Sequence, residues 1–333
     1  MYIYSPDVLR LKPGADHTMK AIIITEFGGV EKLQITEIPK PDIINDEVLI
    51  EVHAISINPV DTRTRSGIAM AAYLERYMPL VLGWDIAGVV TEVGETVTQF
   101  KKGDAVFGMV NFLGHGKGYA EFVACPARHL ALKPPNISFE EAAAATLAAL
   151  TAWQLLKHYA QVKPGQKILI LAASGGVGHY AVQIAKYLGA YVIGVSSEKN
   201  RDFVLSLGAD RHIAYDKQNF EDVITDEVDI VIDAFSKESL VKSLKAVKKN
   251  GLILSLLPMI SEEILGKAAE EGVDIHYQLV SSNGDDMRSI AELLEKDIIK
   301  SKVSAVFPFE KMADAHLKME TGKTTGKIIV KII

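Results

Sequence analysis

The stretch Leu-Ala-Ala-Ser-Gly-Gly-Val-Gly at residues 171–178 decides the fold of this chain. It follows an apolar run at 167–172 that is typical of a buried strand, and it precedes an amphipathic helix pattern from about residue 177 to 188. A glycine-rich turn in this position lets backbone N–H groups approach a pyrophosphate at the positive end of the helix. Ala173 replaces the first expected glycine, so the prediction depends on the strand–turn–helix context. The alternative is a tight turn with no ligand. We expect a dinucleotide site that includes Ser174, Gly175, Gly176, Val177 and Gly178.

The end of the next strand indicates which dinucleotide is bound. Ser196 and Ser197 stand where an NAD site usually carries an acidic residue for the ribose hydroxyls. Lys199 and Arg201 follow and offer cations for a 2′-phosphate, although a solvated helix face is the alternative for both. Glu198 opposes this interpretation, because its carboxylate can accept a hydrogen bond from a free 2′-hydroxyl. The pattern as a whole predicts NADPH.

Length and composition narrow the class of protein. A chain of 333 residues with 48% apolar and 23% charged residues predicts a globular protein with two domains. The net charge of −6 argues against a nucleic-acid partner. The chain has one cysteine, Cys125, which excludes an internal disulfide and suits a reducing compartment. We see neither a membrane-spanning run nor a signal peptide, so we expect a cytoplasmic protein with no membrane partner.

The pattern of elements changes along the chain. Residues 20–140 contain short alternating runs separated by Gly, Pro and Asp, which predicts a β-rich, barrel-like domain. Residues 140–150 predict one Ala-rich helix, with Ser138 as its cap and Glu141 three residues later. From residue 167 onward strands and helices alternate, which predicts a doubly wound parallel sheet. Two closing strands, 305–309 and 327–332, are expected to return to the first domain.

These motifs together resemble a known family. The chain is similar to the medium-chain dehydrogenase/reductase superfamily, and specifically to its zinc-independent, zeta-crystallin-like NADPH:quinone oxidoreductase branch. The resembling segments follow the family's order at 56–61, 82–88, 94, 103–108, 118–122, 173–178, 207–210, 316 and 325–327. The resemblance implies an α/β protein with a GroES-like catalytic domain at 19–142, completed by about 298–333. It further implies a Rossmann domain at 143–297 that binds NADPH, a homodimer or homotetramer, and an N-terminal extension at 1–18.

The resemblance also bears on zinc. Zinc-binding members of the superfamily hold their catalytic metal with Cys, His and Cys, and the matching positions here carry Asn58, Trp84 and Leu147. An amide, an indole and an alkyl group cannot build a tetrahedral zinc site. Asp61 and Asp85 are two nearby carboxylates without a nitrogen or sulfur partner, and His115 and His129 have no zinc spacing. We expect no metal.

Without a Lewis acid, an acceptor that is already electrophilic is the most suitable substrate. Quinones and α,β-unsaturated carbonyls take up hydride directly and spread the charge onto oxygen. The resemblance implies the same reaction, NADPH-dependent reduction of a quinone or an enone. The alternatives are an alcohol or enoyl-thioester dehydrogenase or reductase of the same superfamily, and a non-catalytic NADPH-sensing protein.

Four residues are carried over as catalytic candidates. Asn58 is expected to contact the nicotinamide ribose or a substrate oxygen, or else to be a turn residue before Pro59. Asp61 is expected in a hydrogen-bond network behind the cofactor, or as a structural cap. Thr151 resembles the threonine that faces nicotinamide, and its alternative is a helix-interior threonine bonded to the preceding turn. Tyr73 is the candidate proton donor, with core packing as its alternative and water as the alternative donor.

The resemblance implies further cofactor contacts in the second half of the chain. Tyr215 matches a family tyrosine that touches the 2′-phosphate. The remaining positions follow the fourth and fifth strands of the expected parallel sheet or lie near the C-terminus, where an ordinary surface charge is the alternative: Phe235, Ser236, Leu256, Leu257 and Lys327.

Overall fold

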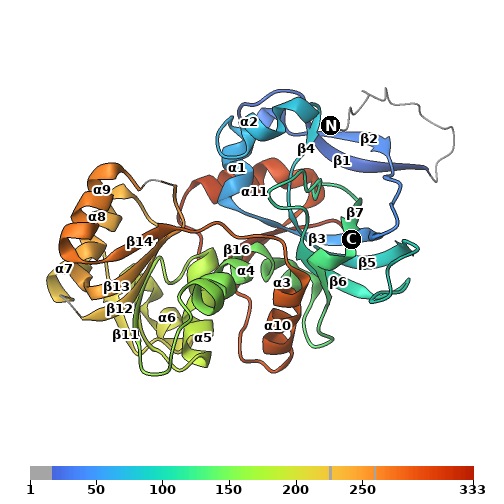
Figure 1. Ribbon diagram of the computed structural model, residues 1–333. Coiled ribbons are helices and arrows are strands. Elements are labelled where there is room, and N and C mark those ends of the chain that lie inside the picture. Colours follow the sequence, from blue (N-terminus) through green and yellow to red (C-terminus); the bar gives the residue numbers. More distant parts are fainter. Residues whose placement is uncertain (1–16, 225–226, 259) are drawn as a thin grey trace.

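The part of the chain that the structure describes forms three β-sheets, and helices cover them or connect them (Figure 1). The computed structural model describes residues 17–224, 227–258 and 260–333. Most of the expected N-terminal extension, residues 1–16, lies outside the described residues.

The parallel sheet contains six strands in the order β11-β10-β9-β12-β13-β14. Their bounds are β9 Lys167–Leu171, β10 Tyr191–Ser196, β11 Arg211–Ala214, β12 Val228–Asp233, β13 Val247–Ser255 and β14 Asp274–Tyr277. The strand order reverses between β9 and β12, as in a doubly wound dinucleotide-binding fold, where the ligand lies at the carboxyl ends of the strands. The helices that connect these strands are α5 Gly176–Tyr187, α6 Arg201–Ser206, α7 Phe220–Val223, α8 Lys237–Ala246 and α9 Glu262–Glu271.

The mixed sheet contains seven strands, six of them in the order β15-β16-β3-β5-β6-β8, and β7 pairs with β3 off this path. Their bounds are β3 Glu47–Ile57, β5 Asp85–Val93, β6 Ala105–Met109, β7 Phe122–Pro126, β8 Leu130–Leu132, β15 Val303–Pro308 and β16 Lys327–Lys331. Strand β16 pairs antiparallel with β3, from Ile328 opposite Ile57 to Lys331 opposite Ala54. The C-terminal strands therefore belong to the same sheet as the strands of the first half of the chain.

A small three-stranded sheet, formed mainly by the first strands of the chain, lies beside the mixed sheet (Figure 1). Its strands are β1 Thr18–Ile24, β2 Gln34–Pro39 and β4 Leu80–Val81, and three short helices lie nearby, α1 Pro59–Arg65, α2 Ala71–Leu74 and the 3₁₀ turn Glu75–Tyr77. Helix α1 begins directly after β3, with Asn58 at its N-cap and Pro59 in its first turn. Proline suits this position because its fixed φ matches the helix and its missing N–H would have no intrahelical partner.

The predicted single helix at 140–150 is wrong. Two helices are present, α3 Phe139–Ala144 and α4 Leu147–Trp153, and Thr146 separates them in a non-helical conformation. The expected cap of the first one is confirmed, because the Ser138 hydroxyl accepts the N–H of Glu141 and the Glu141 carboxylate accepts the N–H of Ser138. The break lets a new helix begin at Leu147, inside the core.

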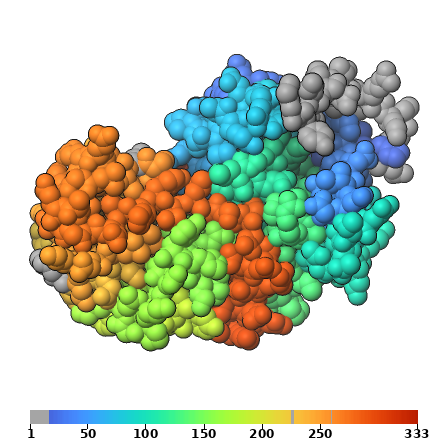
Figure 2. All heavy atoms as spheres, viewed as in Figure 1, coloured from blue at the N-terminus to red at the C-terminus, as the bar shows by residue number. Residues whose placement is uncertain are grey.

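Helix α4 continues into a π-helical segment, Gln154–Tyr159, that connects the two large sheets. There the Asp286 carboxylate accepts hydrogen bonds from the side chains of Trp153 at 3.2 Å, Gln154 at 3.0 Å and His158 at 2.7 Å. Asp286 lies in the first turn of α10 Gly284–Glu295, which packs beside β8 and α4. Figure 2 shows α10 between the lobe of the parallel sheet and the lobe of the mixed sheet.

Two apolar clusters fill the structure. The smaller cluster packs one face of the parallel sheet against α7, α8 and α9, and the larger one extends from β1 through the mixed sheet and α4 to the opposite face of the parallel sheet. Helix α11 Met312–Glu320 covers the mixed sheet near β16 and packs beside α1. Among the described residues, no helix has the length and apolar character needed to cross a membrane.

Candidate active site

The glycine-rich turn lies at the carboxyl end of β9, beside the point where the strand order reverses. Gly175 is the N-cap of α5, and Ala172 takes a left-handed φ of 54°. A Cβ on Gly178 would lie 2.1 Å from the carbonyl oxygen of Ala172, so any side chain would force the helix away from the strand. The turn therefore holds the N-terminus of a twelve-residue helix against β9, which is the geometry that binds a pyrophosphate.

The end of β10 carries a set of small polar side chains next to this turn. The Asn200 amide donates to the hydroxyls of Ser174 at 3.0 Å and Ser197 at 3.2 Å, and its carbonyl accepts from Thr325 at 3.2 Å. Asn200 and Thr325 were not predicted, because neither belongs to the glycine-rich motif. Ser196 is buried, and its hydroxyl lies 2.8 Å from Nε2 of His212. Of the two predicted serines, Ser197 therefore lies closer to the turn.

The two predicted cations differ in their environment. Arg201 donates two hydrogen bonds of 2.8 Å to the Glu198 carboxylate. The two side chains therefore bind each other in this structure and leave fewer donors and acceptors for a ligand. Lys199 is exposed on the 3₁₀ turn Glu198–Asn200. Tyr215 is half exposed and stands edge-on to Phe235, with ring centroids 5.7 Å apart. Two exposed aromatic rings and an exposed lysine at the strand ends suit a stacked base and a phosphate.

The other predicted residues of the parallel sheet follow β12 and β13. The Ser236 hydroxyl caps α8 by accepting the N–H of Ser239 at 3.2 Å. Asp233 ends β12, accepts the N–H of Phe235 at 2.9 Å, and is held by serine hydroxyls from α8. Burial raises the pKa of the Asp233 carboxyl. Leu256 and Leu257 are partly buried beside it, and the N–H of Leu256 donates to the carbonyl of Asp233 at 2.9 Å.

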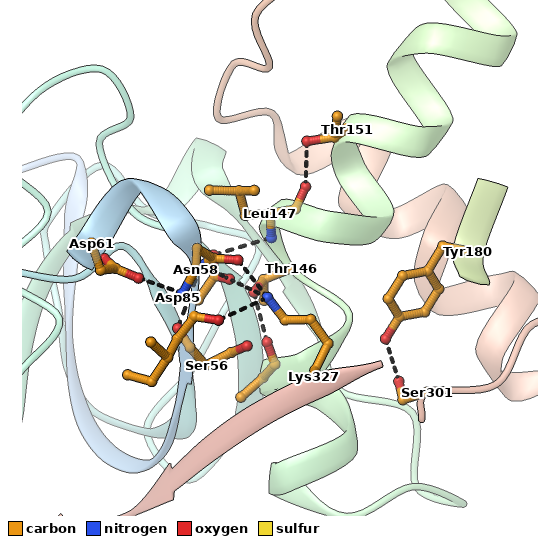
Figure 3. A network of polar contacts seen from close by, with 12 residues as sticks. Ser56, Asn58, Asp61, Asp85, Thr146, Leu147, Thr151, Tyr180, Ser301 and Lys327 are labelled. Carbon is orange, nitrogen blue, oxygen red and sulfur yellow. Dashed lines mark hydrogen bonds and ion pairs between the residues drawn. The ribbon is translucent and has the colours of Figure 1, made fainter. Parts of the chain in front are cut away.

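A second group of polar side chains is buried where α1, β5, α4 and β16 meet (Figure 3). We call Asn58, Asp61, Asp85 and Lys327 the Asp85 cluster, and none of them is more than 2% exposed. The Asn58 amide donates to Asp85 Oδ2 at 2.7 Å, and its carbonyl accepts from the Lys327 ammonium. The Asn58 backbone N–H donates to Asp61 Oδ2 at 2.6 Å. The predicted residues Asn58, Asp61 and Lys327 are thus brought together, and Asp85 is the member that we had considered only as an unsuitable zinc ligand.

The electrostatics of the cluster follow from its burial. Burial raises the pKa of Asp61 to about 8, because the charged carboxylate loses its hydration. Burial also raises the pKa of Asp85, although the Lys327 ammonium and the hydrogen bond from Asn58 oppose this shift. The same loss of water lowers the pKa of Lys327, against the attraction of Asp85 and Asp61. Asp61 therefore retains a proton near neutral pH.

A buried tyrosine–histidine pair lies beside Asp61. The Tyr119 hydroxyl is 2.9 Å from Nε2 of His316, and both side chains are fully buried. Burial raises the pKa of Tyr119, and the carboxyls of Asp61 and Asp85 add to the shift. Burial lowers the pKa of His316 to about 3, with Arg65 contributing in the same direction. His316 is therefore neutral at physiological pH and links α11 to the segment that precedes β7.

The two remaining catalytic candidates lie apart from each other. The Thr151 hydroxyl donates to the carbonyl of Leu147 at 2.7 Å, the arrangement of a helix-interior threonine that bonds to the preceding turn. Tyr73 lies on α2 and is 45% exposed, and the Arg76 guanidinium stacks over its ring at 4.4 Å. Around Tyr73 the chain is helical at residues 71–77, as the short α2 followed by a 3₁₀ turn. Tyr73 thus belongs to the surface of α2, whereas Thr151 is joined to the Asp85 cluster through Leu147.

Comparison with known proteins places the chain in a family. Residues 44–135 match the model of the alcohol dehydrogenase GroES-like domain, and residues 207–330 match that of the zinc-binding dehydrogenases. The chain is 36% identical to the NADPH-dependent alkenal/one oxidoreductase of Arabidopsis thaliana, over 94% of this chain and 79% of that one. It is 34% identical to the quinone oxidoreductase of Homo sapiens, over 94% and 97%. The solved quinone oxidoreductase from Coxiella burnetii superposes with a TM-score of 0.89 at 33% identity, covering 95% of this chain and all of that one.

This chain belongs to the medium-chain dehydrogenase/reductase superfamily, in its quinone oxidoreductase branch. The expected fold class, a GroES-like domain with a Rossmann-type parallel sheet, is confirmed by these matches together with the strand order.

Zinc-binding members of this superfamily need a donor set that these residues do not provide. The Asn58 amide is already bonded to an ammonium and a carboxylate, and the Trp84 indole N–H donates to the carbonyl of Gly114 at 2.8 Å. Burial lowers the pKa of His115 and of His129 to about 4, and each ring is bonded to a backbone group. Within the described ranges, no three His, Cys, Asp or Glu side chains are placed to hold a metal ion. The donor set does not fit zinc.

Proposed function

We propose that this chain is a zinc-independent, NADPH-dependent oxidoreductase that reduces quinones or α,β-unsaturated carbonyl compounds by hydride transfer. Its small-molecule acceptor belongs to one of the two classes named for its relatives. The observation that carries the proposal is the contact between the glycine-rich turn at 172–178, which we call the dinucleotide turn, and the Asp85 cluster. The Lys327 stem packs on Gly176, at the start of α5, and its ammonium reaches Asn58.

The cofactor half of the site is built from the turn and the strand ends. The N-terminus of α5 forms a cradle that a pyrophosphate fits, and the missing Cβ of Gly178 lets this helix start lie against the backbone of Ala172. Ser174, Gly175, Gly176 and Val177 line this cradle. Ser197, Lys199 and Tyr215 contact the 2′-phosphate. Arg201 can join them when its ion pair with Glu198 opens. Ser196 stabilises the end of β10 through its contact with His212. Phe235, Ser236, Leu256 and Leu257 border the rest of the dinucleotide.

The reacting half of the site positions the two partners. When bound, NADPH supplies the hydride, which the acceptor takes up with charge spread onto its oxygen. Asn58 and Thr151 orient the nicotinamide and the acceptor, and Asp61 and Lys327 support Asn58 from behind. The chain thus contributes proximity and exclusion of water, which an electrophilic acceptor requires in place of a Lewis acid. The enolate left by hydride addition to an enone then takes up a proton, which we assign to the half-exposed phenol of Tyr73 on α2, with water as the alternative donor.

Several properties of the whole protein belong to this proposal. We propose a catalytic domain at 19–142 completed by about 298–333, and an NADPH-binding domain at 143–297. We also propose a homodimer or homotetramer formed through the NADPH-binding domains, where β14 is the edge strand of the parallel sheet. The net charge of −6 and the single cysteine support a cytoplasmic protein without a nucleic-acid partner. Light scattering coupled to gel filtration tests the oligomeric state.

The first test is oxidation of NADPH by chelator-treated protein, with an ortho-quinone and an α,β-unsaturated ketone as acceptors and NADH in parallel. Turnover with NADPH preferred is the expected result. Binding of NADPH without turnover on either acceptor would instead favour the non-catalytic sensor. Reduction of NADP⁺ by an alcohol, or oxidation of NADPH only with an enoyl thioester as acceptor, would favour the other dehydrogenases and reductases of the superfamily.

The Tyr73 assignment has its own test. Tyr73→Phe should lower kcat with the enone by about 100-fold, the typical contribution of a positioned general acid. The matched control is Tyr187→Phe, which removes a hydroxyl of similar exposure at the end of α5. Equal kcat values for Tyr73→Phe and the control would assign the proton to water.

A further inference from the structure

Asp85 joins two separate helices of the candidate site through its two carboxylate oxygens. It begins β5, its side chain is fully buried, and its two oxygens accept from different elements. Oδ2 accepts the amide of Asn58 at 2.7 Å, and Oδ1 accepts the backbone N–H of Leu147 at 3.1 Å. Leu147 is the first residue of α4, so the carboxylate holds both the N-cap of α1 and the N-terminus of α4 (Figure 3).

The two neighbours of Asn58 determine which way its amide points. A carboxylate at Asp85 can only accept hydrogen bonds, and an ammonium at Lys327 can only donate them. The Asn58 NH₂ group must therefore face Asp85 and its carbonyl must face Lys327, as observed. A flipped amide would oppose two donors on one side and two acceptors on the other.

The same carboxylate is connected to Thr151. The N–H of Leu147 donates to Asp85, and the carbonyl of Leu147 accepts the Thr151 hydroxyl at 2.7 Å. Thr151 thus lies one turn along a helix whose start is fixed by Asp85. The positions of Asn58 and Thr151 relative to each other depend on one buried side chain.

Lys327 extends this arrangement to the dinucleotide turn. A Cβ added to Gly176 would meet Lys327 Cδ at 3.3 Å, so the lysine stem lies directly on the start of α5. The neighbouring Gly326 donates its N–H to the carbonyl of Ser174 at 2.9 Å. The Lys327 ammonium lies 3.9 Å from Asp85 Oδ2 and also donates to the carbonyl of Ile57 at 3.3 Å.

We propose that Asp85 and Lys327 are positioning residues that fix the Asn58 amide in one orientation and hold it in register with Thr151 and with the start of α5. The proposal rests on the proposed function, because Asn58 and Thr151 orient the nicotinamide and the acceptor there. It reassigns Lys327, which we had expected to contact the cofactor directly, to a place behind Asn58. The pair therefore acts on the rate of hydride transfer rather than on the affinity for NADPH.

Asp85→Asn is the decisive variant. Asparagine keeps the volume but has a single acceptor oxygen, so it can satisfy Asn58 or the N–H of Leu147 and not both. We expect kcat to fall by about 100-fold, the cost of a misplacement of about 1 Å at a reacting group. The dissociation constant for NADPH, read from quenching of Trp84 and Trp153 fluorescence, should change by less than about threefold.

Substitutions of Lys327 test the other member of the pair. Lys327→Met removes the donor to the Asn58 carbonyl and should lower kcat to a similar degree. Lys327→Arg retains a donor and should restore part of the lost kcat. The control is Glu320→Gln, which breaks the ion pair with the buried Arg65 in the same half of the protein. It should lower the unfolding midpoint without lowering kcat.

A third measurement does not depend on turnover. In protein labelled with ¹⁵N-asparagine, the Asn58 side-chain amide should be shielded from hydrogen exchange in the wild type and exchange much faster in Asp85→Asn. Unchanged exchange, or a kcat in Asp85→Asn that falls only as far as the folded fraction or the NADPH affinity falls, would overturn the proposal. A wild-type protein that turns over neither acceptor would instead refute the proposed function and leave the exchange result to decide on the positioning pair.

Discussion

The dinucleotide turn and the Asp85 cluster use the chain in different ways. The turn is made by residues 172–178, which follow one another and present mainly backbone groups. The Asp85 cluster collects residues 58, 61, 85 and 327 and works through side chains. In the turn, a substitution acts by sterics on one short segment. In the cluster, it acts by changing the donors, acceptors and charges of partners distant in sequence.

The largest expected effect comes from a substitution that disrupts the dinucleotide turn. Gly178→Ala places a Cβ 2.1 Å from the backbone of Ala172, so α5 must move away from β9. NADPH affinity should fall by about 100-fold, because a shift of about 1 Å misplaces the N–H donors. The control is Gly266→Ala in the exposed middle of α9, where nothing lies within 4 Å. That control should stabilise the protein by about 0.5–1 kcal/mol. Fluorescence titration and thermal unfolding measure both, and unaltered NADPH binding in Gly178→Ala would place the cofactor elsewhere.

The second effect is confined to the cluster and depends on pH. The pKa of Asp61 is raised to about 8 in the folded protein from an ordinary value of 3.8. Its contribution to stability is therefore full below the lower value and is lost as pH rises through about 8. The loss accumulates as pH rises from about 3.8 to about 8, and Asp61→Asn should remove it, so that its unfolding midpoint depends less on pH in that window. The exposed Asp314→Asn on α11 is the control and should follow the wild type. Parallel pH profiles for Asp61→Asn and the wild type would contradict the raised pKa.

A smaller expected effect distinguishes the binding of NADPH from that of NADH. Lys199→Ala removes an exposed cation beside Ser197 and should weaken NADPH binding by about tenfold, because charge-assisted hydrogen bonds to phosphate are strong. NADH binding should not change. Lys101→Ala, an exposed lysine of the other half, should change neither. Equal losses for NADPH and NADH would show that Lys199 does not read the 2′-phosphate.

The smallest expected effect comes from the ion pair at the same strand end. Glu198→Gln removes the negative charge and one of the two oxygens that accept from Arg201, which weakens the pairing and lets the guanidinium approach a 2′-phosphate. The preference for NADPH over NADH should rise by about two- to fivefold. The double variant Glu198→Gln, Arg201→Ala should lose this gain, and a gain that persists would point to Glu198 itself as the unfavourable group.

The comparison also explains what could be predicted from sequence. The turn, the alternation of strands and helices, and the serines after β10 were readable because each is a local pattern with a fixed spacing. Asn58, Asp61 and Lys327 were proposed by resemblance. The cap that was the alternative for Asp61 is present, because Asp61 accepts the N–H of Asn58 at the start of α1. The contact of Asn58 with Lys327 was not predicted, since the pairing of β16 with β3 brings these two residues together. The position of Asp85 in the sequence also indicates a buried polar contact. A carboxylate within an apolar strand is costly to bury unless it is paired, so it indicates a buried partner.

The remaining differences between the predictions and the structure have local causes. The run of alanines at 140–150 hid the boundary at Thr146, because alanine favours a helix on either side of a break. Asn200 and Thr325 were missed because a single asparagine and a single threonine have no distinguishing pattern, and only the fold places them 3.2 Å apart. Tyr119 and His316 belong to segments that the resemblance identified, but their hydrogen bond joins positions 197 residues apart.

The position of β16 between β15 and β3 has a consequence for synthesis. The parallel sheet uses residues 167–277, all of which leave the ribosome before Lys327, which lies 269 residues after Asn58. The parallel sheet can therefore fold while the mixed sheet still lacks β15 and β16. Until β16 arrives, the edge of β3 is unpaired and Asp85 has no counter-ion. The portion of the chain that is made first is completed last, and during that interval residues 54–57 of β3 have no strand paired on the β16 side.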